Sequence, residues 1–129
     1  MEILSISMDR DELRRLGEVQ KKLGFKSRSK MLRSAIESLE KEYGNVNSLK
    51  GNVESVFVLT YADTRKDNVS DVLHRFEENI KSEMHHHHAG TCMDILNLET
   101  TAKVTKNFFT AVKSCKDIGT VTYSIVSEK

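Results

Sequence analysis

The chain begins with a short stretch of predicted strand that has no second strand near it, and this feature constrains the fold more than any other. Residues 1–8 alternate, so that Leu4, Ile6 and Met8 share one face of the strand. A strand needs a hydrogen-bonding partner, and two helical stretches follow this one directly. The N-terminal residues therefore predict an intertwined dimer, in which the strands of two chains pair as an antiparallel ribbon.

Two amphipathic helices are predicted after this strand. Asp9 and Glu12 form a capping-box pattern that begins the first helix, and Gly24 ends it. The second helix is expected to begin near Ser27 or Ser29 and to continue to residue 43. The polar Gly- and Asn-containing stretch 44–52 then predicts a boundary, so we expect domains at residues 1–45 and 52–129.

The second domain shows strand and helix patterns in the order βαββαβ. Strands are predicted over residues 53–61, 82–88, 92–98 and 120–126, and helices from the apolar spacing within residues 69–80 and 104–115. The two middle strands are expected to form a hairpin around Ala89-Gly90-Thr91. This order predicts an α+β protein with a ferredoxin-like second domain.

Charge is informative only locally. Twenty Lys and Arg against nineteen Asp and Glu give a net charge of +1, which by itself favours neither nucleic acid nor membrane. Residues 21–33, however, contain six basic residues and no acidic one. These basic residues surround the start of the second helix, where free backbone N–H groups favour a phosphate. The predicted two-stranded ribbon would also fit the major groove of DNA. Together the two features predict binding to double-stranded DNA. No signal peptide or membrane-spanning run is recognisable, so we expect a cytoplasmic protein without a membrane partner.

All five histidines lie between positions 74 and 88, and Cys92 follows closely. On a strand His85 and His87 face one side, whereas His86 and His88 face the other. Returning across the turn, Cys92 can join one of these pairs, which predicts a metal site of two imidazoles and a thiolate. Spacing within one chain does not decide whether His74 belongs to the site, and a symmetric partner could supply it. Cys115 lies on the apolar side of its helix and is expected to pack in the core.

The N-terminal motifs Ser5-Ile6-Ser7-Met8-Asp9 and Gly24-Phe25-Lys26-Ser27-Arg28-Ser29 resemble the ribbon-helix-helix transcription factors. The resemblance implies two sets of DNA-binding residues. The outward strand residues would face the bases, and residues at the start of the second helix would hold the backbone: Ile3, Ser5 and Ser7, then Ser27, Arg28 and Ser29. Ile3 lacks hydrogen-bond donors for guanine and could at most contact a thymine methyl.

Both halves together resemble the NikR nickel-responsive repressors, which join a ribbon-helix-helix to an ACT-like, ferredoxin-like domain. His74, His85 and His87 match the spacing of that family, although Cys92 follows His87 by five residues instead of six. The resemblance implies a square-planar Ni(2+) site of His85, His87 and Cys92 with His74 of another chain, in a homotetramer that binds operator DNA and represses nickel-uptake genes. The shorter hairpin leaves His86, His88 and Cys92 as an alternative ligand set.

Two other functions fit parts of the pattern. Two histidines and a cysteine with an open position could activate water on zinc, with Glu83 or Asp94 as the base, although no helical zinc-protease motif is present. The second domain could also sense another metal or a small molecule, as ACT-type domains often do. The prediction remains a DNA-binding regulator and not an enzyme.

Overall fold

The computed structural model describes residues 1–129, which form two compact units, Met1–Tyr43 and Gly44–Lys129. The first unit contains helix α1 (Arg10–Leu23) and most of helix α2 (Arg28–Asn47). The second contains a four-stranded sheet and two further helices. No helix combines the length and the apolar composition that crossing a bilayer requires.

The ends of α1 follow the predicted signals. The Glu12 backbone N–H donates to Asp9 Oδ1 at 2.8 Å, and the Asp9 backbone N–H donates to Glu12 Oε2 at 3.2 Å, which confirms the capping box. Gly24 ends the helix with φ of 72°, a left-handed conformation that glycine adopts without steric cost.

Residues 1–9 adopt no regular secondary structure in the single chain, so the predicted strand is not formed there. The physical reason is that no other segment offers this stretch a ladder of hydrogen bonds. Helix α1 also has no buried residue, and its Leu13, Val19 and Leu23 are each more than two-fifths exposed.

Helix α2 ends at Asn47, four residues beyond the predicted end at residue 43. Its last turn and the following residues belong to the second unit, where Val46 and Leu49 are 1% and 6% exposed. Burial of these two side chains outweighs the weak helix propensity of the neighbouring glycine and asparagine residues.

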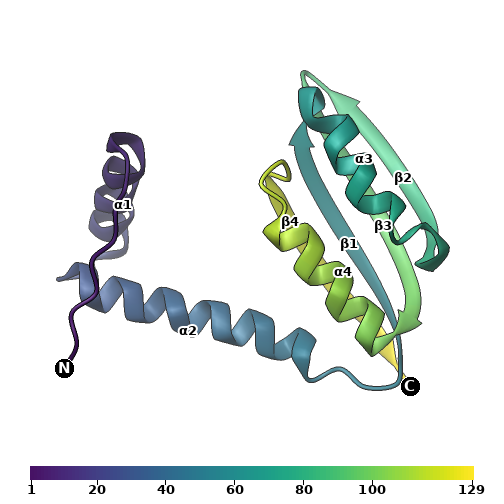
Figure 1. The fold of residues 1–129 in the computed structure, drawn as a ribbon, viewed down its shortest axis with the longest axis horizontal. Helices are drawn as coiled ribbons and strands as arrows, with labels where there is room; N and C mark the ends of the chain where they lie inside the picture. The colour runs from purple at the N-terminus through teal and green to yellow at the C-terminus, as the bar shows by residue number, and fades with distance from the viewer. The chain divides into compact units, whose positions relative to one another are not determined.

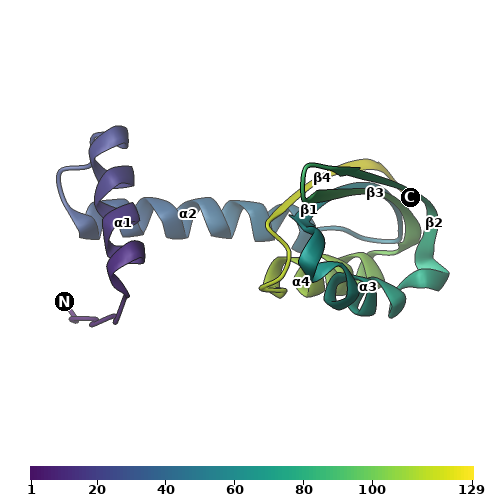
Figure 2. The same cartoon turned by 90° about the horizontal axis from the view of Figure 1, so that it is seen from above.

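The sheet of the second unit has the strand order β2-β3-β1-β4, and all neighbouring strands are antiparallel. The elements follow the chain in the predicted order: β1 (Asn52–Ala62), α3 (Lys66–His74), β2 (Ile80–His88), β3 (Thr91–Thr101), α4 (Ala102–Ser114) and β4 (Thr120–Glu128). Helices α3 and α4 cover one face of the sheet, and the other face carries no helix of this unit (Figures 1 and 2).

Helix α3 is shorter than the apolar spacing suggested. It ends at His74, a 3₁₀ turn covers Glu77–Asn79, and Ile80 already begins β2. Phe76 and Ile80 nevertheless pack against the core. Their apolar spacing therefore predicted correctly that they are buried, but it overestimated the length of the helix.

The core lies between the sheet and the two helices. Every second residue of β1 from Val53 to Tyr61 is buried, and the same alternation runs through β3 from Cys92 to Leu98. The rings of Phe57 on the sheet and Phe108 on α4 meet edge to face, with centroids 4.9 Å apart. Cys92 is part of this core, and Cys115 packs against it from the end of α4, as predicted.

Candidate metal centre and DNA-binding segment

A two-residue turn joins β2 to β3. Ala89 and Gly90 have φ angles of 48° and 81°, which is the conformation of a tight type I′ hairpin turn. Thr91 was expected to be part of the turn, but it pairs with His88 and is the first residue of β3. This turn fixes the register of the hairpin from His88 back to Ser82, where the pairing shifts.

The register places the histidines on two faces. His87 lies opposite Cys92 and His85 lies opposite Asp94, on the face that the helices cover. His86 lies opposite Met93, on the uncovered face, and His88 lies on that face too. Within one chain, the alternative set of His86, His88 and Cys92 would have to draw its ligands from both faces of the sheet.

Asp94 links His85 to the core. Its Oδ1 lies 2.5 Å from Nδ1 of His85, and its Oδ2 accepts a hydrogen bond of 2.7 Å from the hydroxyl of Tyr61. Asp94 is 7% exposed, and burial together with this hydrogen bond raises the pKa of Tyr61. The phenol therefore stays protonated, and the carboxylate is held from both sides.

Neither Asp94 nor Tyr61 is predicted from the sequence as part of a metal site. Asp94 was considered only as a possible base, although its position two residues after Cys92 already placed both on one face. Tyr61 carries no comparable local signal, because β1 is far from the hairpin in the chain and the contact depends on the pairing of Tyr61 with Cys92.

The other candidate ligands contact different carboxylates. His87 Nε2 lies 3.2 Å from Oδ2 of Asp63, and His74 Nδ1 lies 3.0 Å from Oε2 of Glu77. The side chain of His74 is 75% exposed at the end of α3, whereas Cys92 is fully buried. No three His, Cys, Asp or Glu side chains of this chain converge on a common point as metal ligands would.

The donor types still suit a metal that binds nitrogen and sulfur. An ionised carboxylate can only accept, so the contact with Asp94 favours the tautomer of His85 with its proton on Nδ1, and in the neutral imidazole Nε2 then has a free lone pair. A carboxylate behind a histidine is the usual outer support of a metal-bound imidazole. His85, His87 and Cys92 thus share one face of the sheet, and Asp94 is a suitable outer partner for His85.

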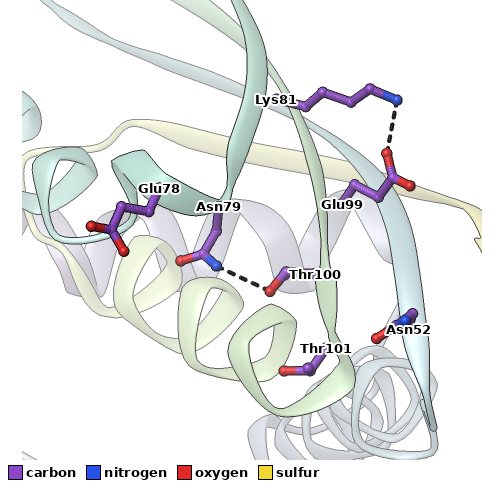
Figure 3. Close-up of a pocket in the computed structure, with 7 residues that line it drawn as sticks. All are labelled: Asn52, Glu78, Asn79, Lys81, Glu99, Thr100 and Thr101. Carbon is purple, nitrogen blue, oxygen red and sulfur yellow. Dashed lines mark hydrogen bonds and ion pairs between the residues drawn. The ribbon is translucent and has the colours of Figure 1, made fainter.

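A separate depression of about 490 Å³ lies at the opposite end of the hairpin from the turn (Figure 3). Within it, Asn79 Nδ2 donates to Thr100 Oγ1 at 3.1 Å, and Lys81 Nζ donates to Glu99 Oε2 at 2.7 Å. The ammonium group of Lys81 lowers the pKa of Glu99. None of the candidate ligands lines this depression, so it is not the predicted metal site.

The candidate DNA-binding residues are exposed in the first unit. Ile3 is 96% exposed, and the two serines of the N-terminal segment are exposed as well. Ser27 caps α2, because its Oγ accepts a hydrogen bond of 3.1 Å from the backbone N–H of Lys30. Arg28 and Ser29 follow in the exposed first turn of α2.

Comparison with known proteins identifies the family. Residues 55–126 match the family model described as the NikR C terminal nickel binding domain, which covers more than half of the chain. The chain belongs to the NikR family. The match spans the sheet and both helices of the second unit, including the hairpin that carries the histidines and Cys92.

Full-length relatives agree with this assignment. A protein of Methanocella arvoryzae named "Putative nickel-responsive regulator" is 26% identical over 96% of this chain and 91% of its own length. A protein of the same name from Halobacterium salinarum is 28% identical over 98% of this chain and 92% of its own length. A Methanosarcina mazei protein named "Putative nickel-responsive regulator 2" is 25% identical over 89% and 85%, respectively.

These names describe regulators and not enzymes, so the family places this chain among regulators and not among zinc hydrolases. One solved structure, of an uncharacterized protein from Thermotoga maritima, matches with a TM-score of 0.54 and 12% identity, covering 59% of this chain and 99% of that one. This match supports the fold alone.

Proposed function

We propose that the protein is a cytoplasmic, nickel-responsive repressor that binds operator DNA of nickel-uptake genes as a homotetramer, a dimer of dimers. The observation that carries the proposal is the hairpin register, which sets Cys92 opposite His87 and beside His85 on one face. In the proposed organisation, residues 1–45 are the ribbon-helix-helix domain and residues 52–129 the ferredoxin-like, ACT-like domain.

The proposed nickel ligands are His85, His87 and Cys92 of one chain and His74 of another. His85 is oriented for this role by Asp94, which holds Nδ1 and keeps Nε2 available. His74 stands 75% exposed at the end of α3, where a neighbouring chain can approach it. Nickel, when bound, would supply a link between chains. To bind it, His87 would have to give up its contact with Asp63, and His74 its contact with Glu77.

The proposed DNA interface requires a dimer. Leu4 and Ile6 are 76% and 58% exposed in the single chain, and pairing of two N-terminal strands would bury them against α1 and α2 of both chains. Ile3, Ser5 and Ser7 would then point outward from the ribbon towards the bases. Ser27, Arg28 and Ser29 would hold the phosphates on either side.

Nickel and DNA binding should be linked. If nickel favours the arrangement of dimers that fits two half-sites, operator DNA must in turn tighten nickel binding by the same factor. The coupling free energy between two such sites is typically about 1 to 3 kcal/mol. A protein whose second domain senses another metal or a small molecule would show the DNA affinity without this dependence on nickel.

The ligand face is tested by two matched double variants. Anaerobic nickel titration should give a sulfur-to-metal charge-transfer band that disappears in Cys92→Ser and in His85→Ala/His87→Ala. It should persist in His86→Ala/His88→Ala, which removes the same chemistry from the opposite face of the same strand. Loss of the band in His86→Ala/His88→Ala, with the band kept in His85→Ala/His87→Ala, would establish the alternative ligand set. The His74→Ala variant should lose both the band and the tetramer.

The DNA function is tested with sites selected from random duplexes by the nickel-loaded protein. Affinity should fall when nickel is chelated, and Arg28→Ala should weaken binding, whereas Lys103→Ala on the second unit should not. Equal affinity with and without nickel would contradict the proposal.

A further inference from the structure

The uncovered face of the hairpin carries a second group of metal-binding side chains that the proposed nickel site does not use. The alternation of β2 places Met84, His86 and His88 on the face opposite to His85 and His87, and β3 adds Met93. Helices α3 and α4 lie on the other side of the sheet (Figure 2). Met84 is 55% exposed, both histidines are exposed and Met93 is partly exposed.

The register brings these side chains within reach of one ion. His86 and Met93 are directly opposed, a relation in which Cβ atoms lie about 4.5 to 5.5 Å apart. Met84 and His88 flank His86 on the same strand, each about 7 Å away. Methionine has a long, flexible side chain, so both thioethers can turn towards the imidazole of His86.

These donors are also free. His85 and His87 contact Asp94 and Asp63, whereas the rings of His86 and His88 take part in no hydrogen bond or ion pair. Glu83, the acidic residue of β2, lies on the opposite face with His85. The group on the uncovered face therefore contains two imidazoles and two thioethers and no carboxylate.

Such a donor set selects a soft cation of low charge. Thioether sulfur favours Cu(I), and imidazole also suits copper, whereas divalent hard cations need carboxylate or carbonyl oxygens. We propose that Met84, His86, His88 and Met93 bind a cuprous ion on the uncovered face of the hairpin. This site would be distinct from the proposed nickel ligands, from which the sheet separates it.

The test must exclude Cys92, whose thiolate would also bind Cu(I). The full-length Cys92→Ser protein is titrated anaerobically with Cu(I) in the presence of a chromophoric Cu(I) chelator. It should still compete for a single ion per chain, and the additional change Met84→Leu/Met93→Leu should abolish this competition. Leucine keeps the volume and apolar character of methionine, and Met8→Leu is the matched control for loss of a thioether elsewhere.

A second measurement locates the ion directly. Ag(I), a redox-stable substitute for Cu(I), should shift the methyl NMR signals of Met84 and Met93 in the Cys92→Ser protein. The signals of Met1, Met8 and Met31 should stay in place and serve as internal controls. Unmoved signals of Met84 and Met93, or equal Cu(I) competition before and after their change to leucine, would overturn the proposal. Either result would leave the proposed nickel site unaffected.

Discussion

Replacement of Asp94 by asparagine tests the outer support of the proposed nickel site. In the native chain, Asp94 accepts from Tyr61 at 2.7 Å and contacts Nδ1 of His85 at 2.5 Å, in a nearly buried position. Asparagine has one acceptor oxygen, and its amide nitrogen must face one of these two partners. When that nitrogen donates to Nδ1 of His85, the imidazole proton moves to Nε2, the atom that must be free to bind a metal.

The expected effect is large enough to measure. Changes to such outer partners weaken metal binding about 10- to 100-fold, which corresponds to about 1.4 to 2.7 kcal/mol. Competition between the protein and a chelator for nickel gives the affinity, and urea unfolding of the metal-free protein shows whether the variant folds.

Two controls separate orientation from general damage. Tyr61→Phe removes one hydrogen bond to Asp94 but keeps the contact with His85, so it should cost about 0.5 to 1.5 kcal/mol of stability and leave nickel affinity close to the parent value. Asp63→Asn alters the exposed partner of His87 and should have a smaller effect than Asp94→Asn. A folded Asp94→Asn protein with the parent nickel affinity would refute the reasoning.

Three further predictions concern stability. Asp9→Ala removes the acceptor that caps α1 opposite Glu12 and should cost about 1 kcal/mol of helix stability, measured by thermal unfolding followed by circular dichroism. Phe108→Ala leaves a cavity in a fully buried position and should cost about 3 to 5 kcal/mol in urea unfolding, and a cost near zero would contradict the described core. Ala89→Asn, beside Gly90 in the turn, should stabilise the hairpin, because L-alanine in a left-handed conformation costs about 1 to 2 kcal/mol and asparagine tolerates it better; slower amide exchange across β2 and β3 would show this.

Elements whose signals are local were predictable from the sequence. The capping box at Asp9, the glycine end of α1 and the strand at residues 53–61 depend on neighbouring residues, and the structure confirms each of them. The end of α2 was not predictable, because Val46 is helical for a tertiary reason: it is buried in the second unit. The N-terminal strand remains a prediction, since a single chain provides no partner for it.

The candidate site was predictable to the level of which residues share a face. His85 and His87 were placed together by the period of a strand, and the register agrees. Tyr61 was missed because its contact with Asp94 crosses from β1 to β3, and no local pattern predicts a cross-strand partner. The source of the fourth donor was also beyond local reasoning, since it depends on chains outside this one.

The length of the turn decides which histidines Cys92 can join. If residues 89–91 had formed a three-residue loop, Cys92 would lie opposite His88, and the alternative pair of His86 and His88 would share its face. The observed loop contains only Ala89 and Gly90, so Thr91 pairs with His88 and Cys92 moves opposite His87. A hairpin of this length therefore separates the four consecutive histidines into two pairs with different chemistry. One pair has a buried thiol and carboxylate partners, and the other has two thioethers and Thr91 beside it.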